Sequence, residues 1–120
     1  MRVLVADDDV SVRNLVKLAL EIKGFDVTAV RNGVEALAQI SESETAFQMV
    51  ILDVTMPKLD GFDTERELRQ REGYGETPVL FLTGNNDASV QGLSHAEVLM
   101  KPFEIGDLFE VVNRVKGASA

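Results

Sequence analysis

One short apolar run constrains the fold of this chain more than any other stretch. Residues Met49–Asp53 read Met-Val-Ile-Leu-Asp and are followed by turn-forming residues. Four apolar residues in a row, ending abruptly at a polar one, are typical of a strand that is covered on both faces. Helices must then flank the sheet that contains it. We therefore expect Asp53 at the carboxyl end of a central parallel strand, where open α/β sheets bind their ligands.

Four further segments have strand character and alternate with segments of helical periodicity. The segment Phe25–Val30 shows some alternation of apolar and polar residues, which indicates a more exposed position in the sheet. This alternation of strands and helices predicts an α/β fold: one domain with a doubly wound five-stranded parallel sheet and right-handed crossovers. The four segments are Arg2–Ala6, Phe25–Val30, Val79–Leu82 and Val98–Met100.

Apolar residues recur at helical spacing between these strands. Asp9 and Asn32 are predicted to cap the first two helices, and Gly24 is predicted to end the first. The third helix, expected over Phe62–Arg71, carries so many charges that it should be largely solvated. The expected apolar stripes are Val12, Leu15, Val16 and Ala19, then Val34, Leu37, Ala38 and Ser41, and finally Ile105, Leu108, Phe109 and Val112.

Composition excludes several classes of function. The chain has no cysteine, so disulfides and thiolate chemistry are impossible, and a single histidine excludes a multi-histidine metal site. A net charge of -8 argues against nucleic-acid binding by this domain and favours cations or basic partner surfaces. Neither a membrane span nor a signal peptide is recognisable, so we expect a cytoplasmic protein. The helical pattern fades near Lys116, which predicts a domain over 1–116 and a tail or linker start over 117–120.

Polar residues of distinct types follow four of the five predicted strands: Asp7 with Asp8, Asp53, Thr83 and Lys101. In a parallel sheet these positions meet at one edge. Clustered carboxylates raise one another's pKa unless a cation neutralises them, and hard oxygen ligands suit Mg²⁺. Asp53 is a carboxylate of the kind that forms an aspartyl phosphate, while Lys101 and Thr83 are suited to contact phosphoryl oxygens. The residues together predict phosphoryl transfer onto Asp53.

This constellation resembles the receiver domain of bacterial two-component response regulators over essentially the whole chain. The acidic pair, the phospho-acceptor, the loop after it, the switch hydroxyl and the Lys-Pro-Phe motif of that family all have counterparts here. The matching positions are Asp7 and Asp8, Asp53, Met56-Pro57 with Asp60-Gly61, Thr83, and Lys101-Pro102-Phe103.

The resemblance implies a flavodoxin-like strand order, 2-1-3-4-5. It also implies that Mg²⁺, or Mn²⁺ in its place, is held by Asp8, Asp53 and the backbone carbonyl of Thr55, with Asp7 acting mainly through a water. The phosphoryl donor would be a histidine kinase or a histidine phosphotransfer protein. A downstream protein target or a C-terminal effector domain would receive the signal, and the domain would catalyse only its own phosphorylation and dephosphorylation.

Two departures from the family concern the route by which a signal leaves. Val98 stands where the family commonly has Tyr or Phe, so the usual aromatic rotamer switch cannot operate. Thr83 and Lys101 are also about one helical turn closer in sequence than is usual. We therefore expect a truncated or disordered fourth helix between them, within 84–97. The sequence leaves open whether the Lys101-Pro102 bond is cis or trans.

Two alternatives to the receiver interpretation remain at this point. A haloacid-dehalogenase-like, Mg²⁺-dependent phosphatase would use similar residue types, but that family has a second Asp where this chain has Thr55, and it generally needs a longer chain. A phosphorylation-independent interaction module would resemble a receiver with a degenerate pocket, yet every pocket residue is present. Asp9 is interpreted only as a helix cap.

Overall fold

The computed structural model describes residues 1–84 and 96–118, which form five strands and four helices. The strands are β1 (Arg2–Ala6), β2 (Asp26–Val30), β3 (Met49–Asp53), β4 (Val79–Thr83) and β5 (Ala96–Met100). The helices are α1 (Val10–Ile22), α2 (Gly33–Glu42), α3 (Gly61–Leu68) and α4 (Ile105–Ala118).

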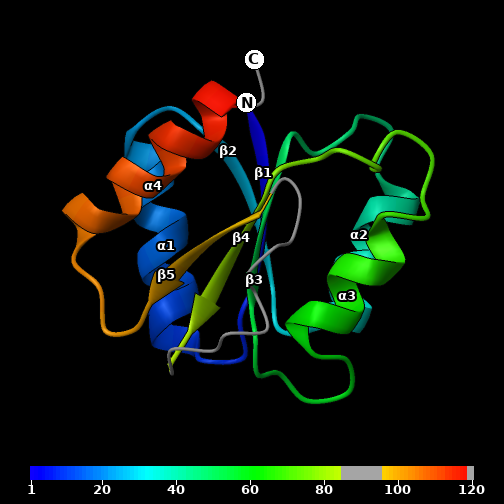
Figure 1. The fold of residues 1–120 in the computed structure, drawn as a ribbon, viewed down its shortest axis with the longest axis horizontal. Helices are drawn as coiled ribbons and strands as arrows, with labels where there is room; N and C mark the ends of the chain where they lie inside the picture. The colour runs from blue at the N-terminus through cyan, green and yellow to red at the C-terminus, as the bar shows by residue number, and fades with distance from the viewer. Residues whose placement is uncertain (85–95, 119–120) are drawn as a thin grey trace.

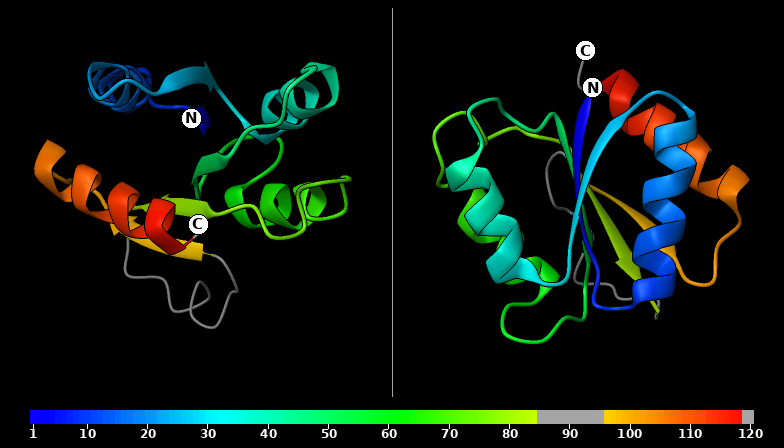
Figure 2. Two further views of the ribbon diagram at one scale, coloured as in Figure 1. Left: turned by 90° about the horizontal axis from the view of Figure 1, so that it is seen from above. Right: turned by 180° about the vertical axis from the view of Figure 1, so that it is seen from behind.

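All five strands are parallel and form one sheet in the order β2-β1-β3-β4-β5. Helices α1 and α4 cover one face of this sheet, and α2 and α3 cover the other (Figures 1 and 2). The predicted flavodoxin-like fold and strand order are confirmed. β2 lies at an edge of the sheet, where Thr28 and Ala29 are partly exposed. This is the exposed position that its polarity alternation predicts.

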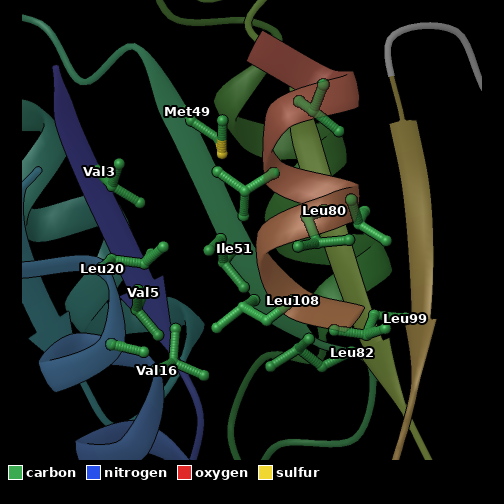
Figure 3. Packing of buried hydrophobic residues seen from close by; sticks show 14 of the residues in the cluster. Val3, Val5, Val16, Leu20, Met49, Ile51, Leu80, Leu82, Leu99 and Leu108 are labelled. Atoms are coloured by element: carbon green, nitrogen blue, oxygen red, sulfur yellow. The ribbon is translucent and has the colours of Figure 1, made fainter. Parts of the chain in front are cut away.

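Alternation along the strands divides the core into two layers. On β3, Met49 and Ile51 belong to the cluster beneath α1 and α4, whereas Val50 and Leu52 belong to the cluster beneath α2 and α3. Figure 3 shows the first of these clusters, with Leu108 of α4 packed among the strand side chains. Because every residue of β3 and β4 is buried, the sheet forms a rigid base for the loops at its carboxyl edge.

The buried face of α2 differs from the predicted stripe. Gly33 packs so closely on α3 that an added Cβ would lie 1.9 Å from Thr64 Oγ1. This contact, together with the cap by Asn32, rotates the helix and turns a different stripe inward. Of the predicted stripe, Leu37 is half-buried and the other three residues are exposed: Val34, Ala38 and Ser41. The buried residues of α2 are instead Gly33, Ala36 and Ile40.

The other predicted stripes are correct in part. In α1, Val16 and Ala19 are buried but Leu15 is 37% exposed, while in α4 Leu108 and Val112 are buried but Ile105 is 42% exposed. Both exposed residues lie at the margin of a stripe, beyond the reach of the sheet.

α3 is shorter and less solvated than predicted. It ends at Leu68, beyond which the N–H groups of Gln70 and Arg71 bond to carbonyls three residues back. The Arg69 guanidinium bonds to the carbonyl oxygens of Tyr74 and Thr77, at 3.1 and 2.5 Å, and to Glu65 at 2.6 Å, which ties the following loop to the helix. The Arg69 and Glu65 side chains are mostly buried.

Helix α4 continues to Ala118, two residues beyond the predicted domain boundary. The predicted short helix between β4 and β5 falls on residues 85–95, which lie outside the described residues. Within 1–84 and 96–118, no helix has the length and apolar character needed to cross a membrane.

Candidate functional site

Three carboxylates gather at the carboxyl edge of the sheet, which lies at the bottom of Figure 1. Asp7 and Asp8 follow β1, and Asp53 ends the neighbouring strand β3. One ligand oxygen from each lies within 4.8 Å of the others. Asp7 is fully buried, Asp53 is 5% exposed and Asp8 is exposed. The structure thus places the three predicted acids together.

The loop after β1 is held by bonds to nearly every polar atom of Asp7. Its backbone N–H donates to the Val30 carbonyl at 3.2 Å, and its Oδ1 accepts from the Asp9 N–H at 2.9 Å. Its own carbonyl accepts from Arg13 Nη1 at 2.9 Å. Sequence reasoning missed Arg13, because no periodic or motif signal links it to Asp7 six positions earlier.

Asp9 has the role predicted for it. Its Oδ1 accepts from the backbone N–H groups of Ser11 and Val12, at 2.9 and 3.3 Å, and so caps α1. This carboxylate is therefore occupied at the helix end and lies outside the acid cluster.

Lys101 directly follows β5, the strand at the opposite edge of the sheet from β2, and its side chain reaches the acids. Its Nζ lies 2.9 Å from Asp7 Oδ2 and 3.4 Å from Asp53 Oδ2. Its backbone N–H donates to the Thr83 carbonyl at 2.7 Å, which ties the end of β5 to the end of β4. The Lys101-Pro102 peptide bond is cis.

The loop after β3 closes tightly around Asp53. The Gly61 N–H donates to the Val54 carbonyl at 3.0 Å, and an added Cβ at Gly61 would lie 2.4 Å from the Asp53 carbonyl oxygen. Asp60 caps α3 by accepting from the Asp63 N–H at 2.8 Å. Only glycine allows α3 to begin this close to the acid, which explains the Asp-Gly pair in the sequence.

Two threonines lie at the same end of the sheet as Asp53, Thr83 at the end of β4 and Thr55 in the loop after β3. Thr83 is the buried last residue of β4, and its neighbour Leu82 pairs in register with Asp53. Thr83 therefore emerges at the same edge as Asp53. Thr55 lies in the loop after β3, and its backbone N–H favours the ionised form of the Asp53 carboxylate.

Burial and charge make Asp53 an unusual acid. Burial, reinforced by the charge of Asp7, raises the pKa of Asp53 to about 7, although Lys101 and the Thr55 N–H favour the ionised form. At Lys101, burial by itself would lower the pKa. The neighbouring charges of Asp7 and Asp53 outweigh burial, so the pKa of Lys101 lies above its ordinary value. Asp53 is thus close to its titration midpoint at neutral pH, whereas Lys101 remains a cation.

The donor set fits a hard divalent cation. It consists of carboxylate oxygens with no sulfur or nitrogen, the set that Mg²⁺ and Mn²⁺ prefer. Asp7 Oδ2 is buried and accepts no well-directed hydrogen bond within the described residues, although Lys101 Nζ lies nearby. One ammonium does not balance three carboxylates, so a further cation would relieve the remaining repulsion.

Comparison with known proteins identifies the family of this chain. Residues 3–113 match the response regulator receiver domain. The chain is 37% identical to the transcriptional regulatory protein CpxR homolog of Haemophilus influenzae, over 99% of the chain and 52% of that protein. It is 36% identical to the transcriptional regulatory protein TrcR of Mycobacterium tuberculosis, over 98% of the chain and 44% of that protein. The chain thus spans about half the length of these relatives.

Solved structures of receivers have the same fold. The chemotaxis response regulator CheY4 of Vibrio cholerae superposes with a TM-score of 0.85 at 32% identity, covering 95% of this chain and 97% of that one. The receiver domain of the sensor histidine kinase PA1611 from Pseudomonas aeruginosa superposes with a TM-score of 0.84 at 25% identity, covering 97% of each chain. In that structure a magnesium ion is coordinated in the active-site cleft.

Proposed function

The chain belongs to the response regulator receiver domain family, and from this premise we propose how its own residues carry out phosphoryl transfer. Asp53 is the phospho-acceptor, and the donor is a phosphohistidine of a histidine kinase or a histidine phosphotransfer protein. The observation that supports this assignment best is the contact of one lysine with two buried acids: Lys101 Nζ lies 2.9 Å from Asp7 and 3.4 Å from Asp53.

A divalent cation completes the proposed site. Asp7, Asp8, Asp53 and the backbone carbonyl of Thr55 would hold Mg²⁺, or Mn²⁺, in agreement with the oxygen-only donor set. The magnesium ion in the related receiver of PA1611 supports the same assignment. When bound, the cation would neutralise the carboxylates and offset charge on the transferring phosphoryl group.

The nucleophile of the transfer is the Asp53 carboxylate. An Asp53 oxygen attacks phosphorus while the phosphorus–nitrogen bond of the donor breaks, and that electron pair returns to the donor imidazole. The product is an aspartyl phosphate. Lys101 pairs with one phosphoryl oxygen, and the Thr83 hydroxyl donates a hydrogen bond to another. Hydrolysis of the acyl phosphate at the same site would reset the domain.

The acyl phosphate is the proposed signal. It adds charge and acceptor oxygens beside Thr83 and Lys101, at the ends of β4 and β5. These strand ends are tied together by the hydrogen bond from the Lys101 N–H to the Thr83 carbonyl, so a shift of one is passed to the other. A downstream protein or a C-terminal effector domain would respond. The net charge of -8 supports a domain that does not itself bind nucleic acid.

The alternatives are less well supported. The family match favours a receiver over a haloacid-dehalogenase-like phosphatase, and the residue two positions after Asp53 is Thr55 rather than an acid. An interaction module that works without phosphorylation would not need the buried contact of Lys101 with Asp7 and Asp53.

Intact mass spectrometry after incubation with acetyl phosphate tests the proposal. We expect one added phosphoryl group in the wild type with Mg²⁺, none with EDTA, and none in Asp53→Asn. Asp9→Asn is the matched control, because it removes a nearby carboxylate outside the cluster while keeping the helix cap, and it should be phosphorylated like the wild type.

Absence of a Mg²⁺-dependent adduct on the wild type would contradict the proposal, as would an adduct on Asp53→Asn. Steady turnover of an added phosphate monoester would instead favour the phosphatase.

A further inference from the structure

Arg13 lies outside the residues assigned above, yet it contacts the acid cluster's backbone. It is the fourth residue of α1, at the end of the first turn, is half-buried, and its Nη1 donates to the Asp7 carbonyl at 2.9 Å. Its own backbone N–H donates to the Asp9 carbonyl at 2.9 Å. Both its backbone and its side chain therefore hold the loop that carries Asp7 and Asp8.

Helix stability does not explain an arginine at this position. The amino-terminal end of a helix carries a partial positive charge, which favours acidic rather than basic side chains there. The first turn of α1 has no acidic residue, and the carboxylate of Asp9 is already bound to the backbone N–H groups that it caps. The contact with the Asp7 carbonyl accounts for the position of Arg13.

This contact matters because of the planarity of the peptide bond. The Asp7 carbonyl and the Asp8 N–H belong to one rigid plane, so a bond at the carbonyl also limits rotation at Asp8. Asp7 is already held through its N–H by Val30 and through its Oδ1 by Asp9. The bond from Arg13 to the carbonyl adds a direct restraint on the Asp7–Asp8 plane itself.

Asp8 is the acid that depends most on this plane. Its side chain is exposed, and among residues 1–84 and 96–118 it makes no hydrogen bond or ion pair. The backbone alone therefore directs its carboxylate into the cluster. Rotation of the Asp7–Asp8 plane would move this carboxylate away from Asp53 and leave a buried carbonyl without its donor.

We propose that Arg13 is a positioning residue for the cation site: its guanidinium holds the Asp7–Asp8 peptide so that both carboxylates remain in one cluster with Asp53. This inference rests on the proposed cation-dependent function. Arg13 acts through a hydrogen bond to the backbone, whereas Lys101 is the cation that contacts the carboxylates.

The test compares Arg13→Gln with Arg31→Gln. Arg31 follows β2 at the same sheet edge and carries the same charge, but its guanidinium binds Glu35 at 2.8 Å instead of the acid loop. Mg²⁺ affinity is measured by amide chemical-shift titration. We expect Arg13→Gln to bind about 3- to 10-fold more weakly than the wild type, and Arg31→Gln to bind within about 1.5-fold of it. Arg13→Lys, which retains one donor, should recover part of the loss.

A second readout needs no metal. In the metal-free protein, hydrogen exchange of the Asp9 N–H reports the bond to Asp7 Oδ1, and we expect faster exchange in Arg13→Gln than in Arg31→Gln. Arg13→Met keeps the aliphatic stem of the side chain and serves as the second variant if Arg13→Gln does not fold.

The outcomes separate this inference from the function on which it rests. If the wild type binds no Mg²⁺, the proposed function fails, while the exchange measurement still decides whether Arg13 holds the loop. If folded Arg13→Gln or Arg13→Met shows wild-type Mg²⁺ affinity and wild-type Asp9 exchange, the positioning role is overturned. An equal loss of Mg²⁺ affinity in Arg31→Gln would overturn it too, because the removal of any positive charge at this sheet edge would then explain the effect.

Discussion

At the scale of single residues, the ionised form of Asp53 is electrostatically unfavourable in the metal-free site. Asp53 is 5% exposed and lies near the buried Asp7, and Lys101 compensates only part of the repulsion. Such a group is expensive to ionise without a further cation. The same feature that readies the site for a metal therefore lowers the stability of the metal-free protein.

The pH dependence of unfolding provides a test of this cost. The ordinary pKa of the aspartate is 3.8, and in the fold it is raised to about 7. The folded state then binds the proton more tightly, so the contribution of Asp53 to stability is greatest below pH 4 and is lost as the pH rises through 7. Without divalent cations, we expect the free energy of unfolding of Asp53→Asn to exceed that of the wild type by roughly 1–3 kcal/mol at pH 8. At pH 4 the difference should be small.

Urea unfolding at the two pH values, in the presence of EDTA, measures this difference. Asp9→Asn provides the control, because it removes an exposed carboxylate outside the acid cluster. If Asp53→Asn is less stable than the wild type at pH 8, the interpretation that ionised Asp53 destabilises the metal-free fold is wrong.

At the scale of elements, the tight contact between α3 and the end of β3 positions the acid. The helix begins at Gly61, against the Asp53 carbonyl oxygen. The Asp60 cap and the hydrogen bond from the Gly61 N–H to Val54 hold that start in place. The loop between β3 and α3 is therefore set from both ends.

Substitution of two helical glycines tests this packing. In Gly61→Ala the new Cβ would lie 2.4 Å from backbone, so the loop must shift, and we expect a loss of about 1–3 kcal/mol in the free energy of unfolding. Gly106 is also in the first turn of its helix, but nothing lies within 4 Å of its added Cβ. Gly106→Ala should be neutral or stabilising by up to about 1 kcal/mol. Equal effects of the two substitutions in urea unfolding would argue against the close-packing explanation.

At the scale of the whole molecule, one sheet edge collects residues from four strands. The strand order places β1, β3 and β4 next to one another, and β5 delivers Lys101 beside them. A ligand at that edge touches residues that are far apart in the chain. Binding of a cation should therefore stabilise the fold as a whole.

Thermal and urea unfolding with and without Mg²⁺ measure this linkage. At a Mg²⁺ concentration 100 times the dissociation constant, the free energy of unfolding of the wild type should rise by about 2.7 kcal/mol, and EDTA should remove this gain. Asp8→Asn should lose most of it, because it removes one of the three clustered carboxylates. Asp9→Asn should keep it. Unchanged wild-type stability at saturating Mg²⁺ would contradict a cation site at this edge.

Sequence alone determined the features that depend on local pattern. The apolar run before Asp53, the alternation in β2 and the polar residues after four strands are local signals, and each identified its element correctly. Asp9 and Asn32 were likewise predictable as caps, because a cap bonds to residues two or three positions away. The grouping of the acids followed from parallel topology.

Only the tertiary structure decided what depends on packing between distant segments. Helical period allowed two neighbouring stripes in α2, and the contact of Gly33 with Thr64 selected the one that is buried. The segment after α3 is held by the bonds from Arg69 to the Tyr74 and Thr77 carbonyls. The bond from Arg13 to Asp7 has no sequence signature, because it joins a helix residue to a loop carbonyl that the helical period does not reach. The sequence thus predicts which groups reach the site, and the tertiary contacts determine how they are held.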